Sequence, residues 1–137
     1  MTPGVLSLAM YLCELAVLEY DMAAYPHSTR AASALLLAQL SVGTPQYTTT
    51  VASLILGTGL DPASLAVCME ALLRLQQAAY CFALSAASNG SVAPSAAGGV
   101  SDLLAPLRAK FGARCWCEAA IMPPVASVPT EQHWACF

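Results

Sequence analysis

A short stretch that is apolar on nearly every side constrains this chain most strongly. Between residues 31 and 40 only Ser33 and Gln39 are polar. A helix without a polar face belongs in the middle of a bundle, where other helices surround it. The sequence therefore predicts an all-α fold, a helical bundle built around this buried central helix.

The residues before this stretch predict a helix of a different kind. Apolar side chains recur there at steps of three and four residues: Val5, Leu8, Leu12 and Leu15. This spacing places them on one stripe that faces a core, while Ser7 and Glu14 face away from it. We therefore expect an amphipathic helix over residues 5–22, then a short turn and the central helix.

A long helix is expected between residues 62 and 86. Asp61 and Pro62 mark its start, because the Asp carboxylate can accept backbone N–H groups and Pro fits the first helical position. Apolar residues then repeat with the helical period. Glu70 and Arg74 lie four residues apart on another face, a spacing that favours an ion pair.

Shorter or irregular segments flank the long helix. Residues 48–56 favour a short helix, although their β-branched side chains leave a strand open. Residues 88–99 are rich in small and helix-breaking residues and predict a flexible insertion. Residues 101–111 favour a helix whose first turns Pro106 distorts. The bundle is thus expected to have about five helices.

Length and composition limit the organisation and the partners. The chain has 137 residues, enough for one core, so we expect one domain over residues 1–126 and an irregular tail over residues 127–137. Only 9% of the residues are charged and 58% are hydrophobic, so part of the surface is expected to need a partner. A net charge of −3 with 5 Lys and Arg residues argues against nucleic-acid binding, which needs a basic surface.

The hydropathy predicts neither a membrane span nor a secretory signal. The longest strongly apolar stretch, residues 31–42, is shorter than the roughly 20 residues that a span needs. No Lys or Arg precedes the first apolar run, and Glu14 interrupts it. We expect an intracellular protein in which Cys13, Cys68 and Cys81, all at apolar helical positions, are buried free thiols.

Four residues near the carboxyl end can be drawn as a zinc site: Cys115, Cys117, His133 and Cys136. Structural zinc sites generally separate paired cysteines by two to four residues, and the single Trp between Cys115 and Cys117 makes a poor chelate. The prediction is therefore no metal and no cofactor. A small thiol or zinc-binding helical protein remains the alternative.

The sequence predicts no catalytic residues. His27 and His133 are the histidines that nucleophilic catalysis could use, and neither lies in a nucleophile turn or a Gly-rich motif. Glu14 and Glu19 are five residues apart, which places them on different faces of a helix rather than together as an acid and a base. We therefore expect that the chain is not an enzyme.

Arg30 stands at the head of the otherwise apolar central helix. A charge there is costly unless it reaches solvent or a carboxylate. Asp21 and Glu19 lie on the other side of the preceding turn, and we expect one of them to pair with Arg30, because buried charges are usually paired. A contact of Arg30 with a partner is the alternative.

Three segments together carry a family resemblance: residues 11–22 read YLCELAVLEYDM, residues 25–38 read YPHSTRAASALLLA, and residues 65–75 read LAVCMEALLRL. They resemble the second, third and fifth helices of the carboxy-terminal cyclin box, specifically that of the mitotic A and B cyclins. Residues 107–111, LRAKF, resemble the basic and aromatic segment near the end of that box. The third helix is the buried one in the family, as its apolar character independently indicates.

The resemblance implies a cyclin box in which the first helix is missing. The amino-terminal box, which in the family engages the kinase and docks substrates, is also absent, so no residue here inherits those roles. His27 stands where the family usually has Pro, and Arg30 where it generally has an apolar residue.

The function that the resemblance implies is that of a non-catalytic regulatory domain. It would be part of a subunit of cyclin-dependent protein kinase that controls the cell cycle, in the nucleus and cytoplasm, and would bind the kinase only together with the missing box. A helical adaptor that binds a partner helix is a further alternative, since an incomplete bundle exposes apolar surface.

Overall fold

The computed structural model describes residues 2–88 and 100–129, and within them it contains five α-helices and no strand. The elements follow in this order: α1 (Pro3–Val17), the 3-10 helix η1 (Tyr20–Ala24), α2 (His27–Val42), α3 (Tyr47–Thr58), α4 (Pro62–Ser88), α5 (Val100–Phe111) and the 3-10 helices η2 (Arg114–Trp116) and η3 (Ala119–Ile121). The all-α prediction is confirmed. Most of the expected insertion at residues 88–99 and of the tail at 127–137 lies outside the described residues.

Helix α2 is the centre of the bundle, as predicted. It packs against α1, α3 and α4. Four of its residues are fully buried: Ala34, Leu36, Leu37 and Ala38. Ser33 is also buried, and its hydroxyl donates a hydrogen bond to the carbonyl oxygen of Leu65 at 3.3 Å, which ties α2 to α4. Gly43 ends the helix in the left-handed region, with φ of 71°.

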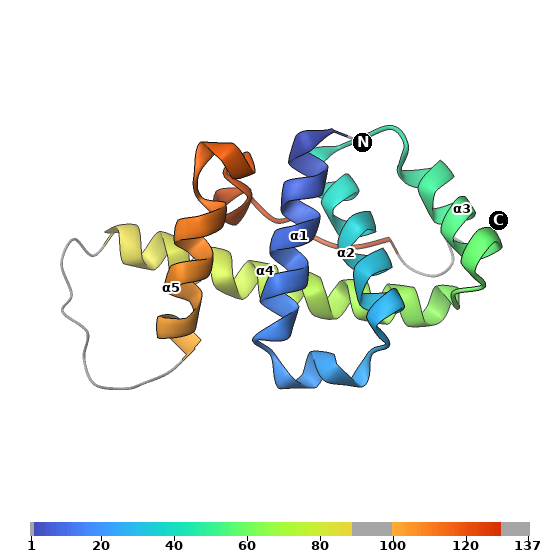
Figure 1. Cartoon of the computed structure of the whole chain (residues 1–137), viewed down its shortest axis with the longest axis horizontal. Helices are drawn as coiled ribbons and strands as arrows, with labels where there is room; N and C mark the ends of the chain where they lie inside the picture. The colour runs from blue at the N-terminus through green and yellow to red at the C-terminus, as the bar shows by residue number, and fades with distance from the viewer. Residues whose placement is uncertain (1, 89–99, 130–137) are drawn as a thin grey trace.

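Helix α4 lies along the length of the molecule, and α1 and α2 cross it (Figure 1). The Asp61 carboxylate accepts a hydrogen bond from the backbone N–H of Ser64 at 2.9 Å, which confirms the predicted helix start. Glu70 and Arg74 form the predicted ion pair, at 2.5 Å. Helix α3 lies at one end of α4 and is helical rather than extended, but Val51 is its only buried residue.

Helix α1 carries the predicted apolar stripe and is shorter than expected. Val5, Leu8, Leu12 and Leu15 are all buried. The helix ends at Val17 because the chain turns at Glu19, and the 3-10 helix η1 inserts Met22 into the core at 2% exposure. Ser7, expected to face solvent, is also buried, because α1 is covered on more sides than its sequence suggests.

Helix α5 packs on α1 through an aromatic cluster. Phe111 is fully buried, and its ring lies 5.5 Å from that of Tyr11 and 4.9 Å from that of Trp116. The helix continues through Pro106 and ends at Phe111, and at the following Gly112 a Cβ atom would lie only 2.7 Å from the carbonyl oxygen of Arg108. The segment after η3 runs back along α4 (Figure 1). None of the described helices combines the length and hydropathy needed to cross a membrane.

Candidate functional site

Two adjoining hollows form an apolar groove between the end of α1 and the helices α4 and α5, which we call the α1–α5 groove. One hollow, of about 430 Å³, is lined by Glu14, Val17, Leu18, Pro106, Leu107 and Lys110. The other, of about 320 Å³, is lined by Leu15, Leu18, Glu19, Leu75, Ala78, Ala79, Phe82 and Leu104. Leu18 lines both hollows, so they lie side by side.

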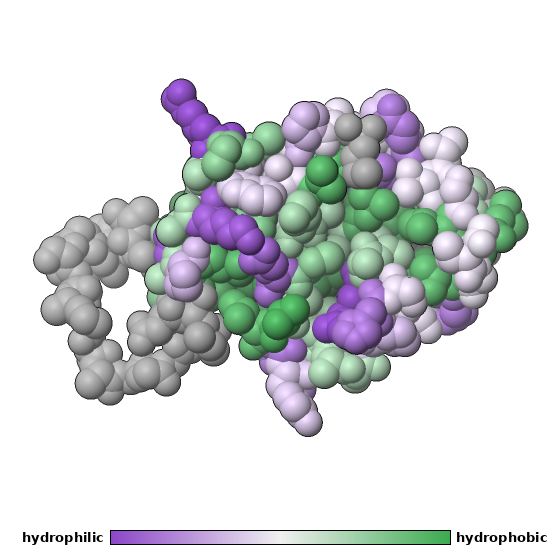
Figure 2. Space-filling view, viewed as in Figure 1, coloured by the Kyte–Doolittle hydropathy of each residue, from purple (hydrophilic) through white to green (hydrophobic). Residues whose placement is uncertain are grey.

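In the α1–α5 groove, apolar side chains of the kind that a hydrophobic core normally buries are exposed to solvent. Val17 is 74% exposed and Phe82 41%. The Lys110 ammonium group donates to the Glu14 carboxylate at 2.5 Å and ties α5 to α1 at the rim. Hydrophobic residues cover much of the face shown in Figure 2, with isolated hydrophilic residues between them. Surfaces of this kind suit the binding of another apolar surface.

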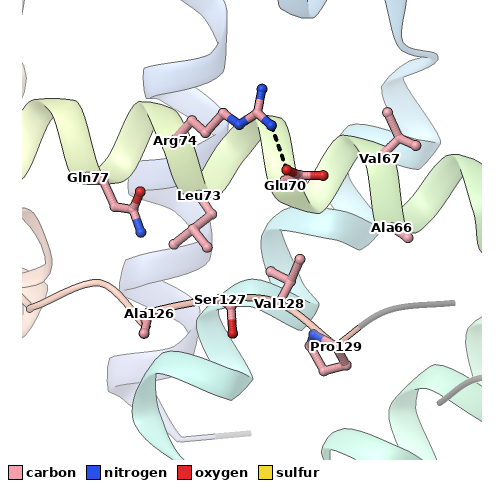
Figure 3. A pocket seen from close by; sticks show the side chains of 10 residues that line it. All are labelled: Ala66, Val67, Glu70, Leu73, Arg74, Gln77, Ala126, Ser127, Val128 and Pro129. Carbon is pink, nitrogen blue, oxygen red and sulfur yellow. Dashed lines mark hydrogen bonds and ion pairs between the residues drawn. The ribbon is translucent and has the colours of Figure 1, made fainter. Parts of the chain in front are cut away.

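A third hollow, of about 430 Å³, lies between α4 and the extended segment at residues 126–129. Figure 3 shows its lining, with Leu73 on the α4 side and Val128 on the facing segment. The Gln77 amide donates to the carbonyl oxygen of Val125 at 3.2 Å and fixes this segment to α4. The two charged residues of the lining, Glu70 and Arg74, pair with each other, so the hollow offers no unpaired charge to a reacting group.

The described residues do not assemble a metal site. Cys115 is exposed, Cys117 is half-buried, and no cluster of three or more His, Cys, Asp or Glu side chains occurs in the described segments. The other two candidate ligands, His133 and Cys136, lie outside the described residues. The zinc alternative therefore stays an untested prediction.

The helical cysteines differ in their burial. Cys68 is buried and Cys13 is half-buried, and both are free thiols. Burial raises the pKa of each thiol, which keeps it protonated and unreactive near neutral pH. Cys81, predicted to be buried, is exposed. It lies two residues from both Ala79 and Ala83, which are buried one turn apart on the same face of α4, so Cys81 points to the other, exposed side of the helix.

The predicted pairing of Arg30 with Asp21 or Glu19 is wrong. The Arg30 guanidinium group lies 2.5 Å from Nδ1 of His27, three residues earlier on the same helix. This neighbour is closer than the carboxylates across the turn because residues three apart share one helical face. The hydrogen bond of His27 is thus made with a guanidinium rather than with a hydroxyl or thiol nucleophile.

The family model for the carboxy-terminal domain of cyclins matches residues 2–100. The match covers most of the chain and includes α1 to α4, with the buried α2 at its centre. This chain belongs to the cyclin family. No curated protein and no solved structure matches it.

The cyclin domain carries its family resemblance on the elements that form the core. Residues 11–22 fall on α1 and η1, residues 25–38 on α2, and residues 65–75 on α4. Residues 107–111 lie on α5, beyond the matched range, where Phe111 joins the aromatic cluster. The α1–α5 groove is therefore partly built from residues outside the matched range.

Sequence reasoning missed two buried glutamines of this cyclin domain. Gln39 and Gln76 are 7% and 2% exposed, and each has side-chain atoms without a hydrogen-bond partner. A signal was present for both, because a glutamine at an apolar position of a helical period enters the core with its amide. The groove between α1 and α5 was also missed, since it depends on how the helices pack.

Proposed function

We propose that this cyclin domain is a non-catalytic part of a regulatory subunit of cyclin-dependent protein kinase that acts in cell-cycle control. The observation that carries the proposal is the match of residues 2–100 to the carboxy-terminal domain of cyclins. The buried α2 supports it, because the resemblance makes this helix the centre of the family fold. The resemblance of residues 11–22 and 25–38 favours the mitotic A or B type, which acts in the nucleus and cytoplasm.

The domain is proposed to support kinase regulation rather than to activate a kinase by itself. In the family, the amino-terminal box carries the kinase contacts, and residues 2–100 of this chain match the carboxy-terminal domain. The hollow between α4 and residues 126–129 has its charges paired, and the α1–α5 groove is mainly apolar.

The α1–α5 groove favours one second candidate, a helical adaptor that binds an amphipathic partner helix. The exposed Val17 and Phe82 would receive the apolar stripe of such a helix. Glu19 lines the groove and would lie beside a Lys or Arg of the partner. The two candidates differ in what binds: the adaptor binds an amphipathic helix by itself, whereas the kinase proposal requires an amino-terminal cyclin box for kinase binding.

The test compares the chain alone with the chain fused behind the amino-terminal box of a B-type cyclin. Both are incubated with purified cyclin-dependent kinases, and binding and phosphorylation of a substrate peptide are measured. We expect the fusion to bind and activate a kinase and the chain alone to do neither. The isolated amino-terminal box and the fusion carrying Leu37→Asp are the controls, because the buried Leu37 holds the fold together.

Two results would overturn the proposal. A fusion no more active than the isolated amino-terminal box would show that the domain gives no support. Activation by the chain alone would show that the carboxy-terminal box contacts the kinase directly. Binding of an amphipathic helix by the chain alone, lost in a Val17→Asp variant, would support the adaptor instead.

A further inference from the structure

The outward side of α1 is apolar. Its exposed or half-buried positions there are Leu6, Met10, Cys13 and Val17, and we call these four residues the α1 stripe. Leu6 is 50% exposed, Met10 39% and Val17 74%. Their steps of four, three and four residues place them on one line along the helix. A surface helix normally carries polar residues on this side, so the α1 stripe indicates a surface that a partner covers.

No unpaired charge accompanies the α1 stripe. Glu14 is the only charged residue between residues 2 and 18. Its carboxylate is paired with the ammonium group of Lys110 on α5. The α1 stripe therefore offers no charge that would select a basic or an acidic partner, and two copies of it can meet without like-charge repulsion.

The α1 stripe is complementary to itself. Its steps read four, three and four in either direction along the chain. When a second α1 packs against it antiparallel, about a two-fold axis, Leu6 of one copy lies opposite Val17 of the second copy, and Met10 lies opposite Cys13. Each pair combines a larger with a smaller side chain, which lets the two rows interdigitate. A second copy of this chain thus meets all four positions at once.

The exposed apolar area is close to what a specific dimer needs. In the antiparallel arrangement Tyr20, which is 89% exposed just beyond α1, lies against the first turn of α1 in the second copy. An aromatic side chain contributes about 150–250 Å² of contact area. Tyr20 and the α1 stripe together offer roughly 500 Å² per copy, hence about 1,000 Å² for the pair, which is the lower limit of specific interfaces. The dimer is therefore expected to be weak, with a Kd of about 10–100 µM.

We propose that the α1 stripe is the contact surface of a two-fold homodimer, in which the α1 helices of two copies of this chain pack antiparallel. This inference goes beyond the proposed function and does not depend on it. Because Val17 also lines the α1–α5 groove, the dimer covers one end of that groove. Self-association and the binding of a partner helix therefore exclude each other.

The test is sedimentation equilibrium of the whole chain from about 1 to 300 µM, a range that brackets the expected Kd. We expect monomers at the low end and dimers at the high end. Met10→Lys should weaken the dimer at least about tenfold, because the two-fold axis brings the added charge into the apolar contact twice. Leu56→Lys is the matched control, since Leu56 is 76% exposed but lies on α3; it should dimerise like the wild type. Circular dichroism verifies that both variants are folded.

A second measurement tests the antiparallel register. In the double variant Leu6→Cys and Val17→Cys, each new thiol faces the other new thiol of the second copy. Glutathione disulfide oxidises the two thiols to one disulfide and is itself reduced to two molecules of glutathione. The two positions lie about 16 Å apart along one helix, so a disulfide between them joins two copies. Mass spectrometry after cleavage at glutamate should find this link in a covalent dimer.

Three results would overturn the proposal. The first is a wild type that stays monomeric over the whole concentration range. The second is a Met10→Lys variant that dimerises as tightly as the wild type, because association would then use another surface. The third is the absence of the disulfide between positions 6 and 17 in the double variant, which would exclude the antiparallel contact.

Discussion

Replacing Gln76 by methionine is expected to stabilise the cyclin domain. Gln76 lies on α4 at 2% exposure, and both polar atoms of its side chain lack a hydrogen-bond partner. An unsatisfied buried group costs about 1–3 kcal/mol, and the lower figure for each of two groups gives about 2 kcal/mol. Methionine has a similar shape without the polar atoms. At this chain length the gain corresponds to a rise of about 8 °C in the thermal midpoint.

The neighbouring glutamine supplies a matched comparison with the opposite sign. The Gln77 amide donates to the carbonyl oxygen of Val125 at 3.2 Å. Gln77→Met removes that bond and should lower the free energy of unfolding by about 0.5–1.5 kcal/mol. Urea and thermal denaturation of both variants, followed by circular dichroism, measure the two effects. Equal signs for the two variants, or a loss of stability in Gln76→Met, would show that the Gln76 amide is satisfied in solution.

Three other outcomes follow from single side chains. Phe111→Ala should lower the free energy of unfolding by about 3–5 kcal/mol in urea denaturation, because a fully buried ring leaves the aromatic cluster, and a loss under 1 kcal/mol would contradict the packing described. Hydrogen bonds from Ser64 hold the pKa of Asp61 below its ordinary 3.8, so this stabilisation is complete above that pH and is lost as the pH falls toward the lowered value. Asp61→Ala should therefore reduce the difference in thermal midpoint between pH 7 and pH 2.5, and an unchanged difference would remove the role assigned to Asp61. With iodoacetamide at pH 8, mass spectrometry should find Cys115 modified before Cys68, whose buried thiol has a raised pKa, and the reverse order would contradict that burial.

The parts of the fold that sequence predicts well are those set by one strong, local pattern. The apolar run of α2 has no polar face, so only a central place in the bundle buries it, and the structure places it there. The start of α4 is also local, because Asp61 reaches the N–H of Ser64 within one turn. Neither prediction needs knowledge of which other helix lies nearby.

The failures concern features that depend on neighbours distant in sequence. Residues 5–22 keep a helical pattern past Val17, but the connection to α2 requires a turn, and η1 buries Met22 there instead of extending the helix. The sequence predicts that Cys81 is buried with Cys68, yet it lies on the side of α4 opposite the buried Ala79 and Ala83. An apolar residue in a helical stretch is buried only where the packed face includes it, and the sequence alone does not show how far that face reaches around the helix.

The two buried glutamines, like the α1–α5 groove, depend on helix packing that the sequence does not show. Both occupy apolar positions in long helices, and both leave amide atoms unpaired. Only the packing separates them: Gln39 lines an open cleft and is tethered at one end to Thr50, whereas Gln76 has no partner at either end. An amide that donates one hydrogen bond lowers stability less than an amide that is unpaired at both ends. Gln39→Met should consequently raise the thermal midpoint less than Gln76→Met, because it also breaks the bond to Thr50. An equal or larger rise would mean that the bond between Gln39 and Thr50 contributes nothing to stability.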